Sequence, residues 1–194
     1  MDLLGDGVLL ARSREDATAF AVIYDRYADD VHRFVLRRLG RDLADDVTAE
    51  TFTQAFRLRE RFDTGRANAR PWLFGIAANL IGKHRRTEVR GLRAVVRLHA
   101  DPVAESWEGP ADDRVVASSA GPALAAALAK LSAADRHVLL LTAWADLSYA
   151  EVAEALDIPV GTVRSRLNRA RQRVRQSLAH EPDVPLHLTT KEAT

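Results

Sequence analysis

The segment Ser148–Arg175, SYAEVAEALDIPVGTVRSRLNRARQRVR, decides how the rest of the chain is interpreted. Ser148 and Glu151 are spaced as a capping box, the arrangement that satisfies free amide groups at a helix N-terminus. The residues that follow predict a short helix, which the turn Asp157–Gly161 separates from a longer helix ending near Leu178. A short capped helix, a tight turn and a longer helix have the dimensions of a helix-turn-helix.

The second of these helices combines an apolar side with a basic one. Its apolar residues recur three or four positions apart and are expected to be buried against the preceding helices: Val163, Leu167, Ala170 and Val174. The rest of its surface carries six arginines and no acid between residues 161 and 178: Arg164, Arg166, Arg169, Arg171, Arg173 and Arg175. Unpaired arginines repel one another, so stability alone does not explain them, whereas a polyanion facing the helix would.

A helix-turn-helix also predicts how these arginines would meet a DNA duplex. Arg164 and Arg166, near the start of the helix, would reach base edges in the major groove. The later arginines would lie along the phosphates. A solvated basic helix is the alternative interpretation, and the agreement of turn geometry with charge disfavours it.

Outward from this motif, the chain shows helical periodicity almost throughout and hardly any strand signal. One helix is expected to be capped by Ser13 with Asp16 and closed by Gly40. A second helix is expected to start at Asp42 and to end at about Arg61.

The loop Phe62–Arg70 precedes a third predicted helix, which begins at Pro71 and runs to about Arg86. Beyond an aperiodic stretch, Pro122 opens a short helix. Another helix is capped by Ser132, three residues before Asp135.

The predicted fold class is therefore all-α, with two small helical domains joined by a flexible acidic linker. The domains are expected to span residues 13–97 and 122–180, with the linker at 98–121 and a frayed tail at 181–194. Residues 101–113 contain five acids, two prolines and no base, which is typical of a linker.

Two further charge clusters are candidates for binding. The segment Lys83–Arg97 carries six bases against one acid, which favours nucleic acid when a second basic element is present on the other domain. Asp42, Asp46 and Glu50 recur every four residues and so share one helix face. That face is either an ordinary solvated surface or a docking face for a basic partner helix.

Several classes of function are excluded or disfavoured by what the 194 residues lack. There are no cysteines, which rules out disulfides, thiol catalysis and thiolate metal sites. No Ser-His-Asp arrangement, phosphate-binding glycine loop or zinc signature occurs, so no enzyme, cofactor or metal is expected. No apolar run approaches the length of a membrane span, and the N-terminus does not resemble a signal peptide, which predicts a cytoplasmic protein.

Four segments, in order, resemble the extracytoplasmic-function (ECF) class of bacterial sigma factors, the small two-domain initiation subunits of RNA polymerase. FAVIYDRYADDVHRFVLRRLG resembles the opening helix of the sigma-2 domain, and DDVTAETFTQAF resembles its core-polymerase-binding segment. RPWLFGIAANLIGKHRR is similar to the segment that melts and reads the −10 element. The stretch from Leu131 to Arg175 is similar to the sigma-4 helix-turn-helix domain that reads the −35 element.

This resemblance implies roles for individual residues. Those expected to face the −35 duplex are Thr162, Arg164, Ser165, Arg166 and Arg169. Those expected at or near the −10 strand are Asn79, Lys83, His84, Arg85 and Arg86, with the loop Phe62–Arg70 holding a flipped base. Those expected to contact core polymerase are Asp46, Glu50 and Phe52.

The resemblance further implies core RNA polymerase, promoter DNA and an anti-sigma protein as partners, and a monomer outside the holoenzyme. Two positions depart from the family pattern: Ala49 stands where a glutamine is usual, and Lys83 where many members have an aspartate.

The main alternative is a helix-turn-helix regulator that binds duplex operators without polymerase. Such proteins usually dimerise, and no free apolar stripe for a dimer is evident.

Overall fold

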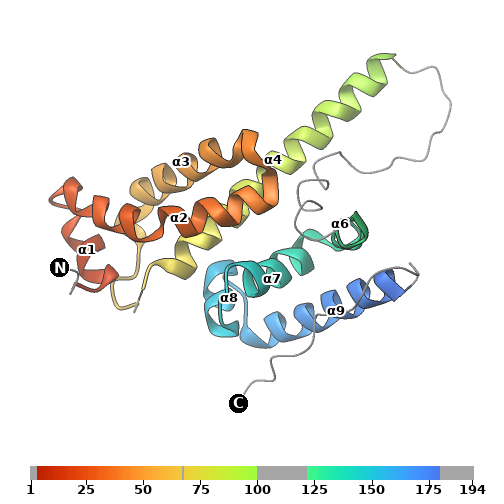
Figure 1. Ribbon diagram of the computed structural model, residues 1–194. Coiled ribbons are helices and arrows are strands. Elements are labelled where there is room, and N and C mark those ends of the chain that lie inside the picture. The colour runs from red at the N-terminus through yellow and green to blue at the C-terminus, as the bar shows by residue number, and fades with distance from the viewer. Residues whose placement is uncertain (1–3, 67, 100–121, 180–194) are drawn as a thin grey trace.

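The computed structural model describes residues 4–66, 68–99 and 122–179, with only the backbone described for 86–99 and 122 (Figure 1). Within these ranges every regular element is helical, which confirms the all-α class. The predicted tail and all but the first two residues of the predicted linker lie outside the described residues.

The N-terminal half is a bundle of three long helices and one short one. The elements are α1 (Asp6–Arg12), α2 (Phe20–Leu39), α3 (Arg41–Leu58) and α4 (Arg70–His99), with 3₁₀ turns at Ala17–Ala19 and Arg59–Arg61. Helices α2 and α3 lie side by side, and the first half of α4 packs against both (Figure 1). The bundle core contains an edge-to-face pair of Phe34 and Phe74, with ring centroids 5.3 Å apart.

Local signals account for most of these helix boundaries. Gly40 ends α2 with a φ of 83°, a conformation that favours glycine, as its position in the sequence predicts. The cap predicted at Ser13 is wrong, because Ser13 follows α1 and its hydroxyl donates to the Leu10 carbonyl. Asp16 instead accepts from the amide of Thr18 and starts the 3₁₀ turn that leads into α2.

The C-terminal half contains α6 (Pro122–Ala129), α7 (Ala133–Trp144), α8 (Tyr149–Leu156) and α9 (Val160–Ala179). Both predicted caps are confirmed: Ser132 accepts from the Asp135 amide, and Ser148 and Glu151 form the full capping box. Helix α9 runs beneath α6, α7 and α8 and buries its apolar stripe against them (Figure 1). All four residues predicted for that stripe are buried, together with Leu178.

The two halves are in direct contact, because α8 packs on the first half of α4. Gly75 of α4 faces the backbone of α8 so closely that a Cβ there would lie 2.2 Å from the carbonyl oxygen of Ala155. Glycine in the middle of a helix destabilises it by about 1 kcal/mol relative to alanine. The close approach of the two helices explains why this position has no side chain.

Candidate nucleic-acid interface

The start of α9 presents the residues that the sequence predicts to face DNA. Arg164 and Ser165 are exposed, and Thr162 and Arg166 are half-buried in the first turns of the helix. The Ser165 hydroxyl donates to the Thr162 backbone carbonyl at 3.0 Å, which holds the Ser165 side chain close to the first turn of the helix. These four predicted residues therefore all lie in the first two turns of α9, and each is at least partly exposed.

Arg169 has a different environment from the one predicted. Its guanidinium donates to both carboxylate oxygens of Asp135 on α7, at 3.0 and 2.8 Å. Arg173 lies 3.6 Å from the same carboxylate. The expectation of six unpaired arginines is therefore wrong for these two, because their acidic partner lies on another helix, 34 residues before Arg169 in the chain.

The hydrogen bonds of this contact join two charged groups, and the Asp135 carboxylate is the buried partner. Asp135 is 2% exposed, and the hydrogen bond from Arg169 holds its pKa below the usual range. The Asp135 hydrogen bond in turn raises the pKa of Arg169, whose side chain is 49% exposed. Arg169 can thus fix α9 to α7 while part of its side chain still faces outward.

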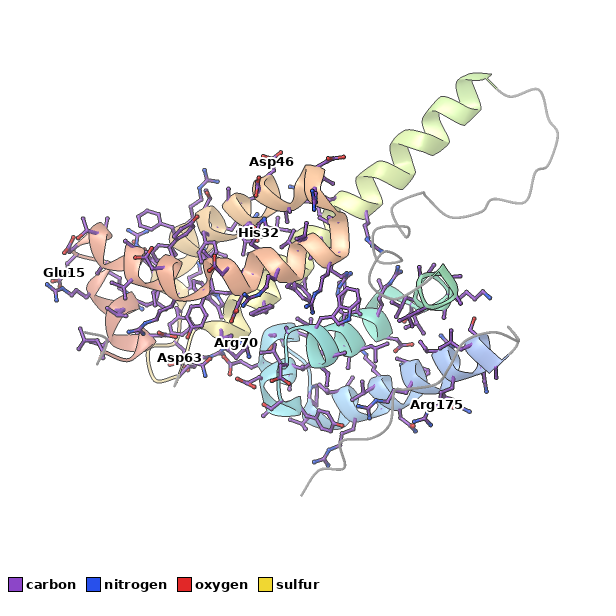
Figure 2. The ribbon with its side chains drawn as sticks, viewed as in Figure 1. Glu15, His32, Asp46, Asp63, Arg70 and Arg175 are labelled. Carbon is purple, nitrogen blue, oxygen red and sulfur yellow. The ribbon has the colours of Figure 1, made fainter. Side chains whose placement is uncertain are left out.

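The other arginines of α9 have no such partner among the residues that the structure describes. Arg164 and Arg166 lie near the start of the helix, and Arg171 and Arg175 lie further along it (Figure 2 labels Arg175). Of these four, Arg166 is half-buried and the rest are exposed. The surface of α9 is therefore cationic along its length, which suits a polyanion.

The −10 candidates on α4 divide into exposed and tethered residues. Asn79 and Lys83 are exposed, although the Lys83 ammonium lies 3.7 Å from a carboxylate oxygen of Glu50 on α3. His84 Nε2 lies 3.2 Å from the other oxygen of Glu50, and Arg85 donates to the backbone carbonyl of Arg38 on α2. The side chain of Arg86 lies outside the described residues.

The loop before α4 is anchored at both ends and exposed between them. We call residues 62–66 and 68–70 the base loop. At its start, the buried Phe62 packs on Trp72 with ring centroids 5.0 Å apart. At its end, the Asn68 side chain accepts from the amide of Arg70 and so caps α4. The residues between these anchors that the structure describes, 63–66, are all exposed.

The acidic face of α3 is less uniform than its four-residue spacing indicates. Asp46 is exposed and points away from the bundle (Figure 2). Glu50 is shared with Lys83 and His84 and so joins α3 to α4. Phe52 is 4% exposed and packs its ring against Tyr24, which places it in the core rather than on this surface.

Asp6 is the most important residue that the sequence interpretation overlooked. Its carboxylate is 3% exposed and accepts from Arg26 and Tyr27 of α2 and from the amide of Ala69 in the base loop. The turn signal Gly5-Asp-Gly7 before the apolar pair Leu9–Leu10 could have indicated a short anchored helix.

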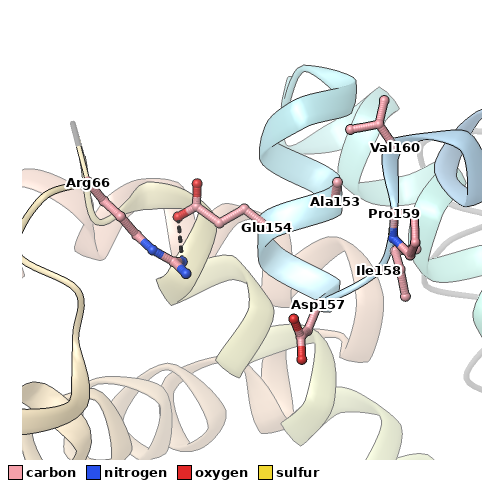
Figure 3. A pocket seen from close by; sticks show the side chains of 7 residues that line it. All are labelled: Arg66, Ala153, Glu154, Asp157, Ile158, Pro159 and Val160. Carbon is pink, nitrogen blue, oxygen red and sulfur yellow. Dashed lines mark hydrogen bonds and ion pairs between the residues drawn. The ribbon is translucent and has the colours of Figure 1, made fainter.

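A shallow groove of about 550 Å³ lies between the base loop and the turn of the helix-turn-helix (Figure 3). It is lined by Arg66, Ala153, Glu154 and the segment from Asp157 to Val160. Arg66 donates to Glu154 across the groove at 2.8 Å. The groove therefore marks the junction of the two halves.

Metal-ligand clusters and membrane-spanning helices are absent from the described ranges. No three histidine, aspartate or glutamate side chains there are grouped so as to hold a metal ion. None of the helices there has both the length and the apolar content of a membrane span.

The sequence matches two family models. The model described as Sigma-70 region 2 matches residues 23–91, and that described as Sigma-70, region 4 matches residues 122–174. The chain is 33% identical over 168 residues to the ECF RNA polymerase sigma factor SigC of Mycobacterium tuberculosis, covering 84% of both chains. It is 32% identical over 176 residues to the ECF RNA polymerase sigma factor SigW of Bacillus subtilis, covering 84% of this chain and 90% of the relative.

Two solved structures resemble the whole arrangement of helices. CnrH, in complex with the cytosolic domain of CnrY, matches with a TM-score of 0.62 and 26% identity, covering 91% of this chain and 98% of that chain. RpoE from Bartonella quintana, in complex with the anti-sigma factor NepR, matches with a TM-score of 0.58 over 84% of this chain and 98% of that chain. At 23% identity, the second likeness concerns the fold alone.

Proposed function

We infer the function of this chain from its family, because it belongs to the extracytoplasmic-function sigma factors of the sigma-70 family. It is a polymerase-binding factor for transcription initiation. Sigma factors act without catalysing a reaction, and we propose that this chain likewise directs the polymerase and has no catalytic site of its own. Its partners, core RNA polymerase and promoter DNA, place its proposed site of action in the cytoplasm.

The observation that carries this proposal furthest is the outward surface at the start of α9. Thr162, Arg164, Ser165 and Arg166 lie together there, on a helix held rigidly by its buried stripe. A helix that enters the major groove uses its first turns to contact base edges. We propose that this surface reads the −35 element, and that Arg171 and Arg175 contact phosphates.

The first domain is proposed to read the −10 element. Asn79 and Lys83 are exposed on α4, and the exposed part of the base loop lies at the N-terminal end of the same helix. A base held out of the stack needs a pocket or loop that recognises its edge. His84 and Arg85, which the structure ties to α3 and α2, would act mainly by holding α4 in place.

Core polymerase is proposed to bind the exposed acidic face of α3 through Asp46. Glu50 contributes less directly, since its carboxylate is shared with two residues of α4. Because Phe52 is buried, we do not assign it a surface contact.

The contact between the two halves implies that the factor opens before it binds a promoter. At about 3.4 Å per base pair, the roughly 25 base pairs between the −10 and −35 elements span about 85 Å. Asn79 follows Gly75 by four residues and Thr162 follows Ala155 by seven, so chain geometry keeps the two reading surfaces within about 40 Å. We propose that α8 leaves α4 when the factor joins core polymerase.

An anti-sigma protein is a further proposed partner. One of the similar solved structures, RpoE from Bartonella quintana, is a complex with an anti-sigma factor. A partner of this kind would keep the two halves of the present chain from separating.

Gel filtration with purified core polymerase tests the proposed function. The chain should co-elute with core, bind DNA weakly when alone, and support run-off transcription only from promoters with suitable −10 and −35 elements. The rival function, a regulator that binds duplex operators by itself, predicts tight binding to duplex DNA without core and no co-elution. That result would contradict the initiation-factor proposal.

A further inference from the structure

Helix α1 lies outside the segment that matches the family model, which begins at residue 23. It nevertheless packs on the start of α2 and against the base loop and the turn before it. The family match therefore does not cover α1. Two residues of α1, Asp6 and Gly7, indicate what the helix does.

The first of these is Asp6, whose buried carboxylate joins three parts of the first domain. One oxygen accepts from Arg26 at 2.5 Å, and the other accepts from the Tyr27 hydroxyl and from the Ala69 amide, each at 2.6 Å. Burial, and next the hydrogen bond to Asp6, raises the pKa of Tyr27, so its hydroxyl stays a donor. A buried carboxylate with three donors holds its neighbours strongly, and one of them is the backbone of the base loop.

The second is Gly7, which touches the same loop at Thr64. A Cβ at Gly7 would lie 2.2 Å from the carbonyl oxygen of Thr64, so the two backbones are in contact. Further bonds tie the adjoining N-terminal segment to this region: Arg14 donates to the Phe62 carbonyl, and Arg59 donates to the Ser13 carbonyl.

Together these contacts surround the exposed part of the base loop. Asp6 holds Ala69, three residues after Arg66, while Gly7 supports Thr64 within the exposed part and Arg14 holds Phe62, the residue just before it. Within the loop, the Asp63 carboxylate accepts from the Gly65 amide and the Asp63 carbonyl accepts from the Arg66 amide. These bonds shape the turn at residues 63–66, and the contacts from α1 and the segment after it fix the position of that turn against the rest of the domain.

We propose that α1 sets the shape of the base loop, with Asp6 as a positioning residue for recognition of the −10 base. This inference rests on the proposed function, in which that loop holds the base. Asp6 does not touch the DNA; it acts through the Ala69 amide and the α2 residues that share its carboxylate. Selectivity for a flipped base depends on donor and acceptor positions within a hydrogen-bond length, so a loosened loop loses preference for its base.

Two substitutions, each with a matched control, test the proposal. Asp6→Asn removes the charge from the buried carboxylate, and Asp16→Asn makes the same change at an exposed cap that does not touch the loop. Gly7→Ala drives a methyl group into the Thr64 backbone, and Gly5→Ala adds the same methyl group where nothing lies within 4 Å. Each variant is assembled with core polymerase and assayed by run-off transcription on promoters substituted singly at every −10 position.

Asp6→Asn and Gly7→Ala should lower the preference at one −10 position by about tenfold, the loss expected for one base contact. Affinity for core and preference at the −35 element should stay at the wild-type level, as should every property of the two controls. Amide hydrogen exchange should accelerate in the base loop of Asp6→Asn and not in α7 or α9. A purely stabilising role of α1 would instead lower activity on all promoters alike.

Wild-type −10 preference in both Asp6→Asn and Gly7→Ala would overturn the inference. Should Asp6→Asn fail to fold, Gly7→Ala and Tyr27→Phe test the inference in its place. Tyr27→Phe is the milder change, because it removes only one donor to the Asp6 carboxylate. Asp63→Ala, a change in the loop itself, distinguishes a failure of the role proposed for α1 from a failure of the role proposed for the base loop. If it shifts −10 preference and the α1 variants do not, only the inference fails; if it has no effect either, the proposed role of the loop fails with it.

Discussion

Asp135 shows how one buried carboxylate divides the arginines of α9 into two groups. Arg169 and Arg173 turn towards it, while Arg164, Arg166, Arg171 and Arg175 have no acidic partner among the described residues. The first group fixes α9 to α7, and the second is available for DNA. A substitution in the first group should therefore affect folding, and one in the second should affect promoter recognition.

Arg164→Ala should relax promoter preference at one or two −35 positions, at a cost of about 1–3 kcal/mol in discrimination. Arg171→Ala should weaken binding to all promoters alike and reduce its salt dependence, because a phosphate contact carries no sequence information. Run-off transcription on a library of −35 variants measures both effects. Unchanged promoter strength and −35 preference in Arg164→Ala and Arg166→Ala would contradict the assignment of α9 as the reader.

Asp135→Asn should lower the free energy of unfolding of the C-terminal domain by about 1.5–3 kcal/mol, the range for hydrogen bonds to charged groups. The effect should depend on pH. The pKa of Asp135 is lowered in the folded state, so its contribution is fully present above its unfolded pKa of about 4 and is lost as the pH falls through the lower folded value.

Urea unfolding followed by Trp144 fluorescence, with Trp72 and Trp107 replaced by Phe, checks this prediction. The difference between wild type and Asp135→Asn should be large at neutral pH and should shrink in acid. Asp29→Asn, a change at an exposed position on α2, serves as the control and should show no such trend. A difference that stays constant through the acid range would show that the ion pair contributes nothing.

At the level of single helices, the acidic row of α3 contains one residue that faces outward and one that joins α3 to α4. Its Asp46 faces outward, whereas Glu50 joins α3 to α4 through His84 and Lys83. Reversing the charge at Glu50 would place like charges against α4, so its effects would mix core binding with the position of the −10 helix. Asp46 is the cleaner probe of the proposed polymerase contact.

Asp46→Arg should weaken association with core polymerase, because it places a positive charge against a basic partner surface, and helix content should not change. The double change with Glu50→Arg should block assembly and also disturb −10 recognition. Asp29→Arg, the same reversal at an exposed position on α2, is the control. Wild-type affinity of the double variant for core, measured by fluorescence anisotropy, would exclude this face of α3 as the binding site.

For the molecule as a whole, the packing of α8 on α4 holds the two halves of the chain together. The contact depends on the absence of a side chain at Gly75, and the Arg66–Glu154 ion pair lies at its edge (Figure 3). A partly exposed ion pair contributes at most about 1 kcal/mol. The close backbone approach at Gly75 should therefore matter more than the ion pair.

Gly75→Ala should separate the two halves, because the added methyl group would overlap the Ala155 carbonyl while favouring the helical conformation of α4. Small-angle X-ray scattering should show a larger radius of gyration for this variant. Gly161→Ala, also within a helix and with nothing within 4 Å of the new Cβ, should leave it unchanged. Equal radii for wild type and Gly75→Ala would contradict the proposed role of the glycine.

Features that depend on residues close together in the chain could be predicted without the structure. The capping box at Ser148, the cap at Ser132, the end of α2 at Gly40 and the buried stripe of α9 all follow from local spacing. They were predictable because a cap or a helical face involves residues within a few positions of one another. The all-α class and the helix-turn-helix follow from the same signals.

The pairing of charged residues, in contrast, depends on how the helices pack. Arg169 meets Asp135 from 34 residues away, His84 meets Glu50 across the same separation, and the Ala69 amide meets Asp6 from 63 residues away. No periodicity links such partners, because they become neighbours only when helices pack. The contact of α8 with α4 is of the same kind, since two backbones can approach at Gly75 only after each helix has formed and docked.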